Sequence, residues 1–167
     1  DGLADTADGF LSSRPRERVL EIMRDSRTGA MGVLAVSSLI VIKAASLASL
    51  PKGSCQAALL LMPLAGRCSQ VMGIALLPYV RQETGLGSIF YEGRSRSLGV
   101  WACLVWIAAG CLLFGARGVA CCLAAQAAVL VFSAWCHRRI GGATGDTLGA
   151  ATEITEALTA VLLSGFL

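Results

Sequence analysis

The chain of 167 residues is 55% hydrophobic and only 15% charged, with a mean hydropathy of +0.68. Soluble domains average about 25% charged residues, so this composition excludes an ordinary soluble domain and favours a membrane protein. The net charge of +3 at pH 7 gives no support to a nucleic-acid partner.

The first predicted element is a short acidic helix at the beginning of the chain. Asp1, Asp5 and Asp8 fall within about 60° of one another on a helix of 100° per residue. Like charges four residues apart destabilise a helix, and a bound cation removes that cost. We therefore expect these carboxylates to hold Mg²⁺, which takes oxygen ligands, rather than to form a solvated helix face.

The rest of the N-terminal segment, up to residue 28, is basic. A break at residues 11–16 precedes a short amphipathic helix over residues 17–24. Arg24 and Arg27 precede the first apolar segment. Because guanidinium groups bind phosphate in a bidentate manner, these two arginines are candidate phosphate ligands. The alternative is that they anchor the chain at the membrane interface.

Five apolar segments follow, each close to the length of about 20 residues that crosses the hydrocarbon core of a bilayer. Backbone polar groups in lipid must be satisfied within the segment, which favours helices. The predicted spans are about 32–50, 55–80, 98–115, 119–136 and 147–167. The sequence thus predicts an all-α, polytopic transmembrane helical bundle as a single integral membrane domain over 1–167, with residues 1–28 as a cytoplasmic helical segment.

The distribution of Lys and Arg between the loops predicts the orientation of the bundle. Alternate loops carry ten basic residues on one side and two, Lys52 and Arg117, on the other. The positive-inside rule assigns the first side to the cytoplasm. The N-terminal segment, the 81–97 loop and the 141–146 loop are therefore expected on the cytoplasmic face of a cell (inner) membrane.

Four charged residues lie within the predicted spans, where charge is costly and usually functional: Lys43, Arg67, Glu153 and Glu156. Arg67 is expected either to pair with one of the two glutamates or to bind a phosphate. A structural role is favoured for Lys43 over a pore-lining one.

A glycine-rich loop precedes the fifth predicted span. Its candidate phosphate-binding residues are Gly141, Gly142, Thr144 and Gly145. Glycines allow close approach of the backbone to a ligand, and a helix N-terminus attracts anions. Asp146 is expected either to cap the helix or to bind metal, and the alternative for the whole loop is a tight interhelical turn.

Four motifs occur in order along the chain, and together they resemble the cobalamin synthase (adenosylcobinamide-GDP ribazoletransferase) family. The motifs are Asp1–Gly9, Ile22–Gly32, 77–81 with 85–87, and Arg139–Glu153. The resemblance covers nearly the whole chain. Members of that family carry further membrane sequence ahead of the first motif, so we expect the chain to lack upstream sequence.

The resemblance implies a Mg²⁺-dependent transferase. Such an enzyme joins adenosylcobinamide-GDP to α-ribazole, or to α-ribazole 5′-phosphate, and releases GMP. The product is adenosylcobalamin or its 5′-phosphate. The lipid bilayer is an implied partner, nucleic acid is not, and a homo-oligomer is left open.

Roles follow for the candidate residues under this interpretation. Displacement at phosphorus needs charge neutralisation and an activated hydroxyl. The expected metal ligands are Asp1, Asp5, Asp8 and Asp146. Either Asp8 or Asp146 is the expected base. The expected phosphate ligands are Arg24, Arg27 and the 141–145 loop, while Glu153 and Glu156 complete the site or orient Arg67.

Two other classes of protein remain as alternatives. A phospholipid synthase similar to the CDP-alcohol phosphotransferases would release CMP from a CDP-lipid. A non-enzymatic transporter subunit would use the charged residues inside the predicted spans as a path across the bilayer, and would not need Mg²⁺.

Overall fold

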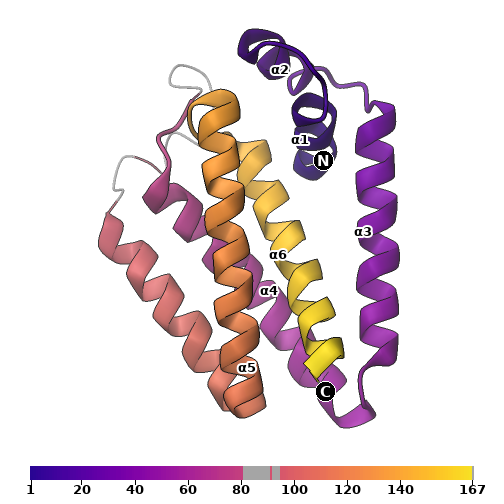
Figure 1. Cartoon of the computed structure of the whole chain (residues 1–167), viewed down its shortest axis with the longest axis vertical. Helices are drawn as coiled ribbons and strands as arrows, with labels where there is room; N and C mark the ends of the chain where they lie inside the picture. Colours follow the sequence, from indigo (N-terminus) through magenta and orange to yellow (C-terminus); the bar gives the residue numbers. More distant parts are fainter. Residues whose placement is uncertain (81–90, 92–94, 167) are drawn as a thin grey trace.

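The computed structural model describes residues 1–80, 91 and 95–166, and this part of the chain is built from α-helices (Figure 1). The helices are α1 (Gly2–Phe10), α2 (Arg16–Ile22), α3 (Ala30–Ser49), α4 (Lys52–Leu76), α5 (Arg96–Ile140) and α6 (Gly145–Phe166). The all-α helical bundle predicted from the sequence is confirmed. Arg81, Arg94 and the motif at 85–87 lie outside the described residues.

Three of the described helices are long and apolar enough to cross a membrane: α3, the Cys55–Leu76 part of α4, and α5. The predicted span 55–80 is too long, because α4 ends at Leu76 and Leu77 is extended (φ −109°, ψ 143°). Pro78 explains this end, since the residue before a proline is driven out of the helical region. The count of five spans stays a prediction.

Helix α5 is a helical hairpin, because the backbone of Gly115 (φ 60°, ψ −141°) reverses its direction. A positive φ of this kind is readily adopted only by glycine. The two limbs run antiparallel: Gln126 Nε2 donates to the carbonyl of Cys103 at 3.2 Å, and Cys122 Sγ lies 3.4 Å from the carbonyl oxygen of Trp106. The predicted spans 98–115 and 119–136 lie on these two limbs.

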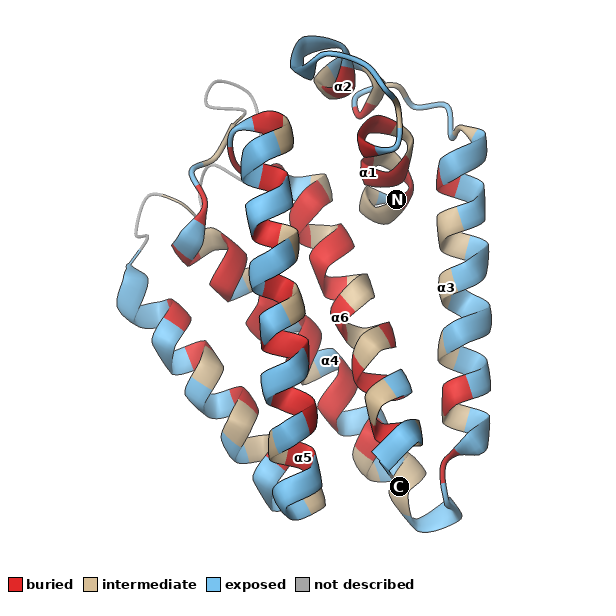
Figure 2. Ribbon diagram, viewed as in Figure 1, coloured by how far each residue is buried: buried red, intermediate tan, exposed pale blue. Residues whose placement is uncertain are grey.

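Helix α4 forms the centre of the bundle and packs against both α5 and α6. Figure 2 shows the buried residues of α4, α5 and α6 facing one another. At Gly66, α4 lies so close to the side chains of α6 that a Cβ atom would be 2.8 Å from Thr152 Cγ2. The hydroxyl of Thr152 also lies 3.4 Å from the Gly66 carbonyl. This contact fixes Gly66 and Thr152 at the same level of the bundle.

Helix α3 stands at the edge of the bundle, where it contacts α1 and α6 and is mostly exposed (Figure 2). Its exposed face is apolar, with Leu34, Ile40 and Val41 among the residues at least 59% exposed. Such a face suits a lipid environment, where apolar side chains need no protein cover.

One end of the bundle collects the N-terminal segment, the end of α4 and the 141–144 turn (Figure 1). Arg16 Nε donates to the carbonyl of Ile140 at 2.7 Å, and Arg139 donates to the carbonyls of Arg14 and Ser12. The grouping of the described N-terminal, α5 and α6 motifs at one end agrees with the predicted topology.

Candidate functional site

The two acidic motifs from the two ends of the chain meet where the first turn of α1 packs on the first turn of α6. A Cβ atom on Gly2 would lie 2.7 Å from the carbonyl oxygen of Asp146 and 2.9 Å from its Cα. A Cβ atom on Gly149 would lie 3.9 Å from the Cα of Gly2. Asp1 and Asp146 are therefore carried by adjoining helical turns, although 145 positions separate them in the sequence.

The N-terminus of α6 is capped by two threonines. Thr147 N–H donates to Thr144 Oγ1 at 3.2 Å, and Thr144 N–H donates to Thr147 Oγ1 at 2.9 Å. This reciprocal pair has the geometry of a capping box. The alternative in which Asp146 caps the helix is wrong, because Asp146 stands inside the first turn. Its carboxylate lies 3.5 Å from the hydroxyl of Thr144.

Asp8, which lies on α1, caps the N-terminus of α3. Its two carboxylate oxygens accept hydrogen bonds from the backbone N–H groups of Gly29 at 2.7 Å and Gly32 at 2.8 Å. The first N–H groups of a helix have no partner within the helix, and their partial positive charge favours a carboxylate. Asp8 thus fixes α3 to α1, and its predicted role as base or metal ligand stays a prediction.

Backbone geometry accounts for two of the loop glycines. Gly141 ends α5 in the left-handed region (φ 86°). Gly142 passes so close to the carbonyl of Pro78 that no Cβ fits. Next to it, Ala143 N–H donates to Pro78 O at 2.8 Å, and Val80 N–H donates to Ala143 O at 2.9 Å. The alternative of a tight interhelical turn describes this loop, and its phosphate-binding role stays a prediction.

Lys43 bridges the two glutamates of α6. Its Nζ lies 2.8 Å from Glu153 Oε2 and 2.7 Å from Glu156 Oε2. The sequence-based alternative in which Arg67 pairs with one of these glutamates is wrong, because Lys43 takes that position from α3. The structural role favoured for Lys43 is confirmed, since the ion pairs tie α3 to α6.

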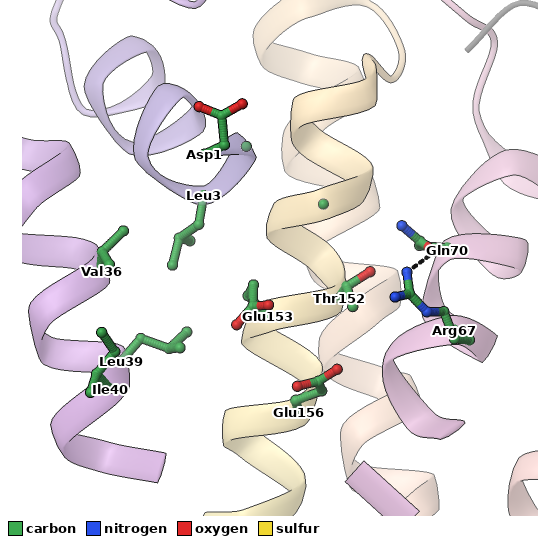
Figure 3. Close-up of a pocket in the computed structure, with 12 residues that line it drawn as sticks. Asp1, Leu3, Val36, Leu39, Ile40, Arg67, Gln70, Thr152, Glu153 and Glu156 are labelled. Carbon is green, nitrogen blue, oxygen red and sulfur yellow. Dashed lines mark hydrogen bonds between the residues drawn. The ribbon is translucent and has the colours of Figure 1, made fainter. Parts of the chain in front are cut away.

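A cavity of about 370 Å³ lies between α1, α3, α4 and α6 (Figure 3). Apolar side chains from α1 and α3 form one wall, and polar side chains from α4 and α6 form the other. The lining residues are Asp1, Gly2, Leu3, Val36, Leu39, Ile40, Arg67, Gln70, Gly149, Thr152, Glu153 and Glu156. The cavity thus begins at the meeting point of the two acidic motifs and reaches into the bundle.

Arg67 contributes the positive charge of the polar wall. Its Nη1 donates to Gln70 Oε1 at 3.1 Å, and the two side chains stand together on α4 (Figure 3). Gln70 and Thr152 were not among the residues selected from the sequence. Gln70 follows Arg67 by three residues on one helix, a spacing that could have indicated the pair.

Arg24 and Arg27 are exposed and are not among the described residues that line the cavity. Arg27 forms a bidentate pair with Asp25, with bonds of 3.0 Å and 2.7 Å. Hydrogen bonds from the Arg27 side chain and backbone lower the pKa of Asp25 to about 2. The predicted phosphate-binding role of both arginines stays a prediction.

A metal site made of protein groups alone is not formed by the described residues. Within 1–80, 91 and 95–166, no three Asp, Glu, His or Cys side chains are grouped closely enough to hold an ion. The donor chemistry nevertheless fits Mg²⁺, which binds through one or two carboxylates together with substrate phosphates. Asp1 and Asp146, on adjoining helical turns, are the candidates for such a pair, whereas half-buried Asp5 lies one turn further along α1. A four-aspartate centre stays a prediction.

Comparison with known proteins shows that the family match and the similar proteins all belong to cobalamin synthesis. The family described as cobalamin-5-phosphate synthase matches residues 1–164. Similar proteins include the adenosylcobinamide-GDP ribazoletransferases of Desulforamulus reducens (41% identical, covering 93% of this chain and 62% of the relative) and Brevibacillus brevis (38%, 99% and 67%). The enzyme of the same name from Citrobacter koseri is 40% identical, over 93% of this chain and 64% of the relative.

The chain spans about two thirds of the length of these curated relatives, from 62% to 67%. No solved structure matches the chain.

Proposed function

The chain belongs to the cobalamin-5-phosphate synthase family, and from this premise we propose that it acts as an adenosylcobinamide-GDP ribazoletransferase. It joins adenosylcobinamide-GDP to α-ribazole, or to α-ribazole 5′-phosphate, and releases GMP. The names of the relatives support this assignment. The observation that carries it is the packing of Gly2 against Asp146, which brings the two acidic motifs to the mouth of one cavity.

The reaction exchanges the phosphoanhydride bond of the donor for a phosphodiester bond. A ribose hydroxyl of the acceptor attacks the phosphorus that bears cobinamide, a new P–O bond forms, and the P–O bond to GMP breaks. The hydroxyl proton passes to a carboxylate acting as general base. We assign this role to Asp146 rather than Asp8, because both oxygens of Asp8 already accept backbone hydrogen bonds.

Mg²⁺ is the proposed metal, held by Asp1 and Asp146. When bound, it neutralises charge on the diphosphate of the donor. The two carboxylates hold and orient the ion, and the first turn of α6 presents backbone N–H groups at the same end. The site faces the cytoplasm of a cell (inner) membrane in this proposal, as the excess of Arg at this end suggests.

The test is a GMP-release assay on the protein reconstituted in lipid vesicles. Adenosylcobinamide-GDP and α-ribazole are supplied with Mg²⁺ or with EDTA, and GMP is measured by chromatography. We expect GMP release only with Mg²⁺ and with both substrates present. A parallel reaction with a CDP-lipid tests the phospholipid synthase alternative. CMP release there, without GMP release from adenosylcobinamide-GDP, would overturn the proposal.

A further inference from the structure

A second cavity, of about 240 Å³, lies between α4 and the two limbs of α5. It shares no lining residue with the cavity of the candidate site. The buried side chains of Met72 and Ala75 line it together with buried Gly99, and every other lining residue except Arg96 is also uncharged. We call this cavity the α4–α5 groove. Its lining combines apolar side chains with a single guanidinium group, which suits a ligand that is part hydrocarbon and part anion.

Exposed apolar side chains form the opening of the α4–α5 groove. Leu76 is 51% exposed, Val100 is 60% exposed and Leu130 is 51% exposed, and all three line the groove. They belong to helices that are long and apolar enough to cross a membrane. The groove therefore opens toward the hydrocarbon of a bilayer, and a lipid chain can enter it from the side.

Arg96 lies at the end of the groove that is nearest to the membrane surface. It is the first residue of α5, and Leu76 is the last residue of α4. From this level the groove follows α5 to Cys103, a distance of seven residues or about 10 Å along the helix axis. A phosphate at Arg96 would therefore leave an attached acyl chain directed along the groove toward the middle of the bilayer.

The charge of Arg96 is not balanced by the helices that form the groove. Neither α4 nor α5 contains Asp or Glu, and the ion pairs between described residues involve Arg18, Arg27 and Lys43. A guanidinium group matches the geometry of a phosphate, and basic sites between membrane helices bind anionic lipid head groups. The charge of the groove thus complements an anionic lipid.

The volume of the groove suits one hydrocarbon chain. Sites for drug-sized molecules enclose about 300–1,000 Å³, and the groove is smaller at about 240 Å³. We propose that the α4–α5 groove binds an anionic glycerophospholipid of the bilayer, with one acyl chain in the groove and the phosphate at Arg96. This site is separate from the transferase site, and its occupation requires neither Mg²⁺ nor the transferase substrates.

The test is native mass spectrometry of the protein in detergent micelles, titrated with either of two lipids. Dioleoyl phosphatidylglycerol is anionic, and dioleoyl phosphatidylcholine has the same chains without net charge. We expect Arg96→Gln to lower the affinity for phosphatidylglycerol about fivefold, because one exposed cation near an anionic lipid contributes modestly. The affinity for phosphatidylcholine should stay within about twofold. Arg117→Gln, which changes an exposed arginine beside the turn of α5, is the matched control and should alter neither affinity.

A second pair of variants tests the position of the acyl chain. Val100→Trp places a larger side chain at the opening of the groove, so it should weaken the binding of both lipids. Val105→Trp changes a residue of the same limb that is 50% exposed and does not line the groove, and it should leave binding unchanged. Circular dichroism checks that each variant retains the helical content of the unmodified protein.

Three outcomes would overturn the proposal. The first is equal affinity of the unmodified protein for the two lipids, or a preference for phosphatidylglycerol that Arg96→Gln retains in full. The second is lipid binding that Val100→Trp leaves unchanged. The third is displacement of phosphatidylglycerol by glycerol phosphate, which carries the anion without acyl chains and would identify a site for a soluble phosphate. All three are read from lipid binding, so they are independent of GMP release and of the proposed function.

Discussion

Two aspartates with the same predicted roles, Asp8 and Asp146, occupy different environments. Asp8 gives both carboxylate oxygens to the backbone N–H groups at the start of α3. Asp146 stands in the first turn of α6, where Thr144 and Thr147 already cap the helix. The comparison teaches that aspartates with the same predicted roles can be used differently by the fold: Asp8 caps α3, while the chemical role of Asp146 stays a prediction.

The largest effect is expected for Asp146→Asn. Loss of the proposed base and metal ligand should lower the rate of GMP release about 100-fold or more. The thermal unfolding midpoint in detergent should stay close to that of the unmodified protein, because the threonine cap of α6 is retained. A variant that loses stability together with activity would break the distinction between the two aspartates.

The opposite pattern is expected for Asp8→Ala. Removal of this cap leaves two N–H groups of α3 without their partner and should lower the free energy of unfolding by about 2 kcal/mol. Asp8→Asn retains one carbonyl oxygen and should lose about half as much. Unfolding of both variants is measured by circular dichroism in detergent. Unchanged stability with abolished GMP release would show that Asp8 has a chemical role instead.

Lys43→Met tests a third set of carboxylates, Glu153 and Glu156, which are paired with a lysine instead of with backbone N–H groups. The change leaves Glu153 and Glu156 without their shared cation in a half-buried position. We expect a loss of about 2 kcal/mol in the free energy of unfolding, less than for a fully buried pair. Adding Glu156→Gln to this variant should recover part of the loss. A double variant less stable than Lys43→Met would contradict the ion-pair account.

The smallest effect is expected for Asp25→Asn at the surface. The pKa of Asp25 is about 2 in the folded protein, below its ordinary value of 3.8. The stabilisation by this exposed Arg27 pair is small; it is fully present above pH about 4 and is lost as the pH falls toward 2. Thermal unfolding at pH 7 should show no measurable change, because both groups are exposed. A lower midpoint would assign the loop before α3 a structural role.

The sequence predicted most of the fold because long apolar runs and the needs of a lipid-exposed backbone leave little choice except helices. The predicted interruption after residue 115 coincides with the turn of α5 at Gly115. The capping box of Thr144 and Thr147 was not predicted, because Asp146 was expected as the cap, although the two threonines are three residues apart.

The pairing of side chains between helices was not readable from the sequence. Lys43 and Glu156 are 113 positions apart, and no periodicity within one segment indicates their contact. Similarly, the spacing of Asp1, Asp5 and Asp8 places all three carboxylates on one helix face and does not distinguish their roles. Only the packing of α3 on α1 shows that Asp8 is used as a cap.

The most direct test of the account is the binding of Mn²⁺, as a substitute for Mg²⁺, measured by electron paramagnetic resonance with adenosylcobinamide-GDP present. Carboxylate oxygens suit both ions. If the first turns of α1 and α6 share the metal, Asp1→Asn and Asp146→Asn should each weaken Mn²⁺ binding about tenfold or more, while Asp25→Asn leaves it unchanged. Mn²⁺ binding in both variants equal to that of the unmodified protein would contradict the account.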